Sequence, residues 1–392
     1  MTERTPDIWR IALAVALFLC AWALLHVGFY ERDQIIDTPI YERYGELMRD
    51  GEVPYRDFRV EYPPAALPVF LLSALPGGDY RQWFETLMAL CGCGTIVAVG
   101  LSARCLTLGF GTLAYVALAP LALGSVLLTR FDLWPAMLTS FALAALLAQR
   151  LRLGHAALGL AVAAKLYPGV LLPVALAQAW RRGGRREALL CGGLFAAVVL
   201  AVYLPFLLVA PDGVAASVGR QLSRPLQIES LGAAMLLAVH QLLGVGIEMH
   251  SGHGSQNLVG PAADVLAVLL SVAQVVTLVW LWIRFARGEQ TPARLARYAS
   301  ASLVAFVALG KVLSPQFLVW LIPVVPLARR MWATFALTVA LVLTQLWFPY
   351  RYWDLVREFD PLASWLVVAR DLALVVLLVL LVREPARERT RT

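Results

Sequence analysis

The stretch LGHAALGLAVAAKLYPGVLLPVALAQAWRR, residues 153–182, decides how the chain is threaded through a membrane. It is apolar on both sides of Lys165 and ends in the arginine cluster of residues 181–186. If the apolar part were one long span, this cluster would lie on the outer side, against the preference of Lys and Arg for cytoplasmic loops. We therefore predict two short helices, 153–165 and 168–180, that enter the membrane and return through a tip that carries Lys165.

The composition is that of a membrane protein. The chain has 392 residues, of which 60% are hydrophobic and 15% charged, and its mean hydropathy is +0.72. A soluble domain cannot cover so much apolar surface, and several apolar runs approach the ~20 residues that a spanning helix needs. The formal charge of +7 therefore indicates cytoplasmic loops and not a nucleic-acid-binding surface. We predict an all-α polytopic membrane protein without a nucleic-acid partner.

The apolar runs predict about twelve membrane segments in one integral membrane domain over residues 1–392. A second pair of short helices has Lys311 at its tip. Both termini, the arginine-rich connections and a basic tail at 383–392 then lie in the cytoplasm. The long outer loops are 30–82, with interfacial helices, and 210–261. The predicted segments are 9–29, 83–104, 108–129, 132–149, 153–165, 168–180, 188–209, 262–284, 297–310, 315–328, 331–349 and 362–382.

The chain contains only two lysines, Lys165 and Lys311, and each one lies at the tip of a short-helix pair. An ammonium group at such a tip is costly unless an anionic group meets it, so the two lysines predict a site for a phosphate headgroup. The plainer alternative is that both lysines extend to the membrane interface. Hydroxyl and amide groups near the lysines, and one arginine fork, would add directed hydrogen bonds. These residues are Tyr167, Ser314, Gln316 and Arg130.

The first outer loop, 30–82, is rich in carboxylates and aromatic rings. Asp37 lies just beyond the first membrane segment, where partial burial can raise the pKa of a carboxylate, and we predict that it is a general base. Alternatively, Asp37 only caps a helix that begins at Pro39. Asp57 follows Arg56 directly, so it either braces the loop through that arginine or contacts substrate.

The second outer loop, 210–261, supplies further polar candidates. We expect residues 230–246 to form a helix on the membrane surface. His250 and His253 lie among Gly and Ser residues, which favours a flexible loop over a metal site. The candidates for contact with sugar hydroxyls, with an ordinary solvated loop as the alternative, are Arg224, Gln227, Glu229 and His240.

Several known motifs are absent from the sequence. It has no Walker loop, no GxSxG elbow, no Rossmann glycine pattern and no HExxH. It also has no Asp-x-Asp pair to hold a metal-bound nucleotide sugar. A sugar donor would therefore be lipid-borne and handled without a metal or cofactor. Arg370 and Asp371 lie inside the last apolar run, where charge is costly, and the sequence assigns them no role.

Six motifs in this order make the chain similar to a known superfamily. They are Asp37…Tyr41, Pro54–Phe58 with Tyr62-Pro63-Pro64, Arg130–Pro135, Lys165–Pro168, Gln227–Ser230, and Lys311–Gln316 with Trp320. The chain resembles the GT-C membrane glycosyltransferases, and within them the actinobacterial α-1,2-mannosyltransferases that use polyprenyl-phosphate-mannose.

The resemblance implies a GT-C-like fold and a polyprenyl-phosphate donor whose hexose is normally mannose. It also implies a glycolipid or glycan acceptor, inversion at the anomeric carbon, no metal, and Asp37 as the base. Tyr41, Tyr62 and Asp132 would contact substrate. Two rivals from other classes are a lipid or lipid-linked-sugar flippase with broken helices, and an assembly subunit without activity. A flippase would need charge along both halves of the bundle, whereas the inner half is expected to be bare.

Overall fold

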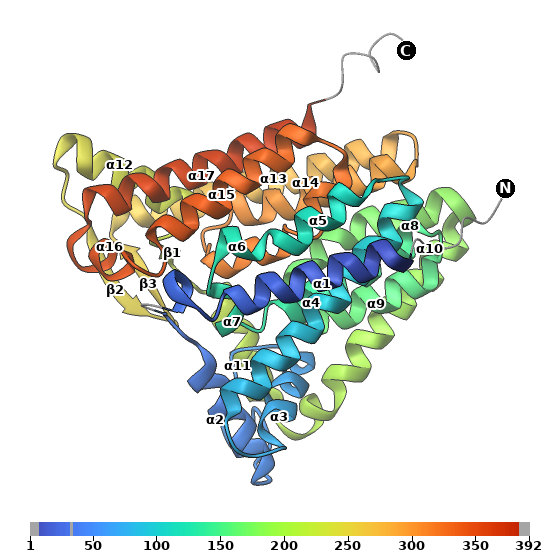
Figure 1. Cartoon of the computed structure of the whole chain (residues 1–392), viewed down its shortest axis with the longest axis horizontal. Helices are drawn as coiled ribbons and strands as arrows, with labels where there is room; N and C mark the ends of the chain where they lie inside the picture. Colours follow the sequence, from blue (N-terminus) through green and yellow to red (C-terminus); the bar gives the residue numbers. More distant parts are fainter. Residues whose placement is uncertain (1–7, 32–33, 384–392) are drawn as a thin grey trace.

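The computed structural model describes residues 8–31 and 34–383, so the predicted tail 383–392 lies outside the described residues apart from Arg383. Most of the chain is helical, as expected (Figure 1). The α-helices are α1 (Ile8–Leu24), α2 (Thr38–Arg49), α3 (Leu67–Ala74), α4 (Tyr80–Cys105), α5 (Phe110–Leu118), α6 (Pro120–Leu123), α7 (Val126–Thr129), α8 (Leu133–Leu147), α9 (Leu151–Ala164), α10 (Leu172–Val209), α11 (Pro211–Leu222), α12 (Leu231–Leu243), α13 (Pro261–Arg287), α14 (Pro292–Ala308), α15 (Met331–Trp347), α16 (Tyr352–Glu358) and α17 (Pro361–Val382). The 3-10 helices are η1 (Gly28–Glu31), η2 (Pro64–Ala66), η3 (Tyr167–Leu171), η4 (Pro315–Trp320) and η5 (Val325–Ala328).

The first short-helix pair is broken where the sequence predicts. Helix α9 ends at Ala164, and Lys165 has extended backbone angles before η3 leads into α10. Helix α10 is interrupted at Gly184, whose combination of φ +68° with ψ −166° is readily adopted only by glycine. The chain therefore breaks twice, once at Lys165 and again at Gly184 within the arginine cluster.

The second pair is less regular than expected. Helix α14 ends at Ala308, and the residues after Lys311 form the two 3-10 helices η4 and η5 instead of one α-helix at 315–328. Prolines at 315, 323 and 326 lack the backbone N–H that an α-helix needs, which explains the irregular path. The expected single helix at 108–129 is also divided, into α5, α6 and α7, because Pro120 and Gly124 (φ +78°) interrupt it.

The all-α expectation needs one correction, because residues 226–259 contain a small antiparallel sheet. Strands β2 (Glu248–Gly252) and β3 (Ser255–Val259) form a hairpin, and β1 (Leu226–Gln227) pairs with β3. The hairpin turn is His253-Gly254, and both residues have positive φ, at 56° and 69°. This is the backbone that two-residue hairpin turns require. The segment expected to be a flexible loop is therefore ordered by strand pairing.

Four helices are long and apolar enough to span a membrane, or five if the bent pair α15–α16 is one span, within the part of the chain described here. The remaining apolar helices have 17 residues or fewer, so the count of about twelve membrane segments stays a prediction. Helix α12 has 13 residues, or about 20 Å at 1.5 Å per residue, which is short for a core ~30 Å thick. It packs along α17.

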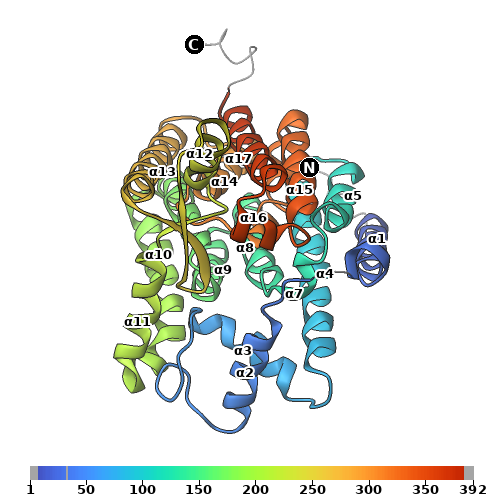
Figure 2. The ribbon, with the colours of Figure 1, turned by 90° about the vertical axis from the view of Figure 1, so that its left-hand side faces the viewer.

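The loops expected on one side of the membrane do gather at one end of the bundle. The start of α1 and the end of α17 lie at the opposite end from α2, α3, α16 and the strands (Figure 1). Figure 2 looks at this loop end, with α1, α13 and α17 seen nearly along their axes. Helices α2 and α3 pack closely at Gly45, where an added Cβ would lie 2.4 Å from the Phe70 carbonyl oxygen. This contact fixes the helix that begins after Asp37.

Candidate active site

Asp37 lies at the loop end of the bundle and pairs with an arginine. It occupies the position before the first turn of α2, but its side chain accepts no capping hydrogen bond. Its Oδ2 lies 3.1 Å from Nε of Arg130, and the Tyr41 hydroxyl donates to the same oxygen over 3.5 Å. The Asp37 side chain is 27% exposed, whereas Arg130 is buried. Helix capping therefore does not account for this carboxylate.

A second ion pair lies next to the first. Nζ of Lys165 donates to Oδ1 of Asp132 over 2.6 Å, and Nε1 of Trp320 donates to the same oxygen over 2.6 Å. Asp132 is only 1% exposed, and its Oδ2 has no hydrogen-bond partner among the described residues. The Lys165 ammonium also lies 4.6 Å from the ring centre of Phe131 and 5.1 Å from that of Trp320. Aromatic faces attract a cation at this range.

The two ion pairs are held together by three consecutive residues. Arg130 leaves α7 in an extended conformation, and Asp132 precedes the first turn of α8, with Phe131 between them. This short link places Arg130 next to the first outer loop and Asp132 next to the broken helix pair. Positive and negative charges therefore alternate across the site, in the order Asp37, Arg130, Asp132 and Lys165.

Aromatic rings form the wall behind these charges. Tyr41 stacks on Phe70 at 4.7 Å, and Tyr62 lies edge-on to Phe131 at 4.8 Å. Tyr167, which was expected to bind phosphate, instead stacks on Trp320 at 3.9 Å. Its hydroxyl lies 3.0 Å from Oγ1 of Thr139 in the helix bundle. Tyr167 thus supports the tryptophan that donates to the buried carboxylate.

The second outer loop meets the second lysine tip. The backbone N–H of Gln227 donates to the carbonyl oxygen of Lys311 over 3.0 Å. The side-chain Nε2 of Gln227 donates to Oγ of Ser314 over 2.8 Å. The Gln227 amide also contacts the buried carboxyl group of Glu229. Gln316 follows at the start of η4 and is half-buried. Two segments that are far apart in sequence therefore form one polar cluster.

The cluster around Glu229 and the Asp37 site share the charge of Arg130. Burial raises the pKa of the Glu229 carboxyl to about 8, while Arg370, Arg130 and Arg224 act in the opposite direction. Arg130 therefore influences both Asp37 and Glu229. Burial therefore favours the neutral form of the Glu229 carboxyl group.

Arg370 is the site residue to which the sequence assigned no role. Its Nη2 donates to the backbone oxygen of Glu229 over 2.6 Å, and its Nε lies 2.8 Å from Oδ1 of Asp371. Arg370 is 0% exposed, although it belongs to α17 at the far end of the chain. A charge pair in an apolar run was the available signal, since such residues face a bundle interior and find partners there.

Two candidates lie outside this cluster. Asp57 pairs with Arg56 over 2.9 Å and accepts a hydrogen bond from the Val53 N–H over 2.8 Å, which lowers its pKa to about 2. Nδ1 of His240 lies 2.8 Å from the Val245 carbonyl oxygen, at the end of α12. Both groups are engaged locally. No group of three His, Cys, Asp or Glu side chains suited to a metal ion occurs in the described ranges.

Two comparisons identify relatives of the chain. Residues 61–315, more than half of the chain, match glycosyltransferase family 87. The fold is similar to the crystal structure of ArnT from Cupriavidus metallidurans bound to undecaprenyl phosphate, with a TM-score of 0.52 and 17% sequence identity over 96% of this chain and 77% of that one. No curated protein matches the chain. The family match and the shared fold establish that this chain belongs to glycosyltransferase family 87 and is a membrane glycosyltransferase of the GT-C fold.

Proposed function

We propose that the protein transfers a hexose, with mannose as the first choice, from a polyprenyl-phosphate donor to a hydroxyl group of a glycolipid or glycan. One observation carries this proposal: a partly exposed carboxylate, Asp37, contacts a buried arginine, Arg130, beside a second buried cation, Lys165. A general base next to groups that stabilise a leaving phosphate is what such a transfer requires. The lipid class is supported by the undecaprenyl phosphate bound to ArnT.

Exposure favours Asp37 as the base among the three carboxylates of the site. Asp132 is buried, and its Oδ1 already accepts two hydrogen bonds. Glu229 is buried, and burial raises the pKa of its carboxyl group to about 8. Asp37 alone of these three is partly exposed, and it contacts an arginine. It is therefore the carboxylate of the three that an acceptor hydroxyl can reach.

Arg130 changes its partner during the reaction. In the resting site its Nε contacts Asp37. A guanidinium group can also donate two parallel hydrogen bonds to one phosphate group. When the donor phosphate takes this position, the Asp37 carboxylate becomes free to accept a proton. Lys165, held by Asp132, adds a second positive charge close by.

The reaction is a single displacement. The acceptor oxygen forms a bond to the anomeric carbon, the bond from that carbon to the phosphate oxygen breaks, and the acceptor proton passes to Asp37. Polyprenyl phosphate leaves with its additional negative charge opposite Arg130, and the anomeric configuration is inverted. Preorganised positive groups at a leaving phosphate are a large source of catalysis. The mechanism assigns no step to a metal.

In this proposal the site lies on the extracytoplasmic side of the membrane. The segments that form it lie at the loop end of the bundle, whereas the arginine clusters, including residues 181–186, lie at the end shared by the start of α1 and the end of α17. Arg and Lys prefer cytoplasmic loops. Both termini are therefore cytoplasmic in this proposal.

The test is sugar transfer by purified protein reconstituted with labelled polyprenyl-phosphate-mannose and a total lipid extract as acceptor source. Chelator is present throughout. We expect a labelled glycolipid with wild type and none above background with Asp37→Asn. The matched control is Asp50→Asn, at the other end of α2, where the carboxylate is largely exposed. Normal transfer by Asp37→Asn would rule out Asp37 as the general base. Absence of product with every polyprenyl-phosphate sugar would favour the flippase.

A further inference from the structure

Two buried oxygen atoms in the second outer loop have no hydrogen-bond partner among the described residues. They are Oε1 of Gln227 and Oε1 of Glu229, and the two residues are 3% and 2% exposed. The orientation of the Gln227 amide is fixed, because its Nε2 already donates to the Glu229 carboxyl group and to Oγ of Ser314. A buried oxygen without a partner is unfavourable. This Gln227–Glu229 pair is therefore suited to hydrogen bonds with a bound polar molecule.

The backbone that carries the pair is held from three sides. Gln227 belongs to β1 and pairs with Asn257 of β3, and its N–H donates to the carbonyl oxygen of Lys311. Nη2 of Arg370 donates to the backbone oxygen of Glu229 over 2.6 Å. None of these contacts uses the two unpartnered oxygens. Groups that are fixed in advance lose little conformational entropy when a ligand binds.

One short segment connects the pair to the proposed phosphate site. Ser314 accepts a hydrogen bond from Gln227, and Trp320, at the end of η4, donates to Asp132. Helix η4 has six residues, so it covers about 12 Å. The charge of Arg130 also acts on the pair. A sugar whose phosphate lies at Arg130 is therefore within reach of the two oxygens.

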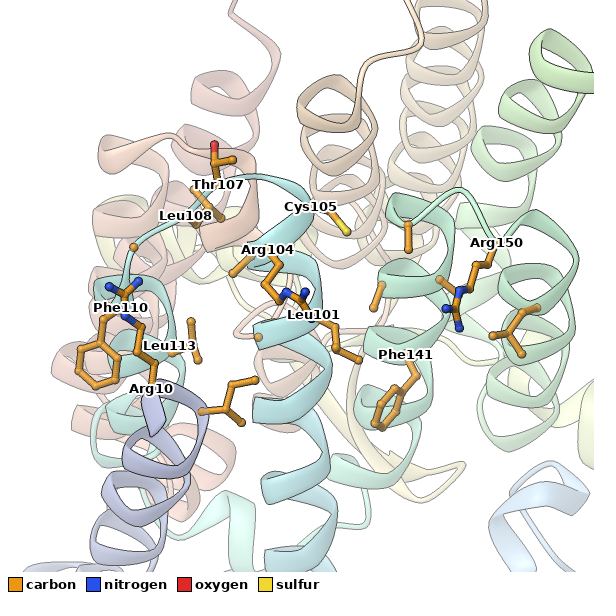
Figure 3. Close-up of a pocket in the computed structure, with 18 residues that line it drawn as sticks. Arg10, Leu101, Arg104, Cys105, Thr107, Leu108, Phe110, Leu113, Phe141 and Arg150 are labelled. Atoms are coloured by element: carbon orange, nitrogen blue, oxygen red, sulfur yellow. The ribbon is translucent and has the colours of Figure 1, made fainter. Parts of the chain in front are cut away.

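The opposite end of the bundle contains a different cavity. It has a volume of about 910 Å³ and is lined by residues of α1, α4, α5, α8 and α9 (Figure 3). Arg104 and Arg150 line it together with Leu101 and Phe141, so the expectation of a bare inner half needs correction. No residue of the candidate active site lines this cavity. Recognition of the donor sugar therefore belongs to the loop end.

We propose that Gln227 and Glu229 bind a hydroxyl group of the donor hexose and so determine which hexose is transferred. The inference rests on the proposed function, because its ligand is the sugar of the polyprenyl-phosphate donor. An amide oxygen only accepts hydrogen bonds. Burial favours the neutral form of the Glu229 carboxyl group, which both donates and accepts. A sugar hydroxyl group also does both, and therefore suits this combination.

The experiment compares kcat/KM for transfer from polyprenyl-phosphate-mannose and from its monodeoxy analogues, each of which lacks one hydroxyl group. A site that bonds a hydroxyl group rejects a donor without it, because buried protein groups then stay unpaired. We expect wild type to use one analogue about 10–100-fold less well than the mannose donor. Glu229→Met should lose this discrimination. Glu229→Gln keeps groups that donate and accept, so it should keep the discrimination.

The matched control is Gln241→Met, which removes a half-buried polar side chain in the last turn of α12. Its amide donates to the Phe359 carbonyl oxygen, away from the pair, so this variant should discriminate as wild type does. Thermal midpoints check that each variant is folded. Unchanged discrimination in Glu229→Met would overturn the inference, as would an equal loss in Gln241→Met.

The comparison of donors by wild type needs no variant. Equal use of all analogues would overturn the inference, and it is the result expected if only water meets the two oxygens. An effect of Glu229→Met on the KM for acceptor alone would assign the pair to the acceptor and would overturn the inference as well.

Donor binding separates this inference from transfer itself. Native mass spectrometry of full-length Asp37→Asn protein with the same donors measures recognition without turnover. Weaker binding of one deoxy analogue, with no such difference in Asp37→Asn/Glu229→Met, would support the inference even if wild type transfers no sugar. Transfer without discrimination would overturn this inference alone. Absence of both transfer and donor binding would overturn it together with the proposed function.

Discussion

Two carboxylate–cation pairs lie side by side in the candidate active site, and they differ in their surroundings. In one pair, Asp37 is partly exposed and contacts Arg130 over 3.1 Å. In the other, buried Asp132 accepts hydrogen bonds from Lys165 and Trp320. Both pairs join a carboxylate to a cation, so the difference between them is burial. The exposed carboxylate can contact a substrate, whereas the buried one holds its neighbours in place. Substitutions in each pair should therefore affect different properties.

The largest effect is expected from Asp37→Asn. Loss of a general base lowers turnover by about 10²–10⁴-fold. Asparagine keeps the side-chain shape and an oxygen that can accept from Arg130, so the thermal midpoint in detergent should change little. Initial rates and thermal unfolding of the same preparation check this prediction. If instead the thermal midpoint falls strongly, and the loss of activity matches the fraction of protein that is unfolded, Asp37 has a structural role.

Lys165→Met should act first on stability. Removing one partner of a buried ion pair costs about 3–5 kcal/mol, because the other charge stays buried and unpaired. The measurement is the free energy of unfolding or, where unfolding is irreversible, the thermal midpoint.

The double variant Lys165→Met/Asp132→Leu sharpens the comparison of the two pairs. Removing both charges removes the unpaired carboxylate, so stability should recover toward wild type. Transfer activity should stay low in the double variant, because Lys165 also supplies positive charge near the phosphate. Recovery of both stability and activity would show that Lys165 acts only through Asp132.

The lysine-poor composition was enough to identify both lysine tips from the sequence. Lys165 stands out because the basic residues are otherwise arginine, apart from Lys311, and the arginines at 181–186 require a helix break before them. The structure confirms the break at Lys165. The divisions at Pro120 and Gly124 were also visible in the sequence. The prediction of one helix at 108–129 followed the length of the apolar run and did not take account of these two residues.

The partners of the site residues could not be predicted in the same way. Asp37 and Arg130 are 93 positions apart, and Glu229 and Arg370 are 141 apart. Hydrophobic patterning predicts which residues lie in helices, but it contains no information on which helix ends meet. Arg370 is the clearest example. The sequence shows that a charge in an apolar run is costly, but it does not show that the partner of Arg370 is the backbone of Glu229. The hairpin at 248–259 was missed because the His253-Gly254 turn was interpreted only as a flexible loop.

Glu229→Gln tests the buried carboxyl group through pH. The folded-state pKa of about 8 lies above the ordinary value of 4.5, so the folded state retains a proton that the unfolded state loses. Wild-type stability from this group is therefore fully present below about pH 4.5 and is lost as pH rises to about 8. The variant lacks this loss, on the order of a few kcal/mol. Thermal midpoints at pH 5 and pH 8.5 should diverge in favour of the variant. Parallel midpoints would show that Glu229 is ionised throughout.

Asp57→Asn should have the smallest effect and decides between the two roles open to this residue. Asp57 pairs with Arg56 at the surface, and solvent screens such exposed pairs so that they add little stability. A bracing role therefore predicts nearly unchanged transfer and a small fall in the thermal midpoint. If Asp57 instead contacts the acceptor, the apparent KM for acceptor should rise while the midpoint stays constant. Steady-state rates over a range of acceptor concentrations separate these outcomes, because only the loss of an acceptor contact raises the KM for acceptor without a change in the thermal midpoint.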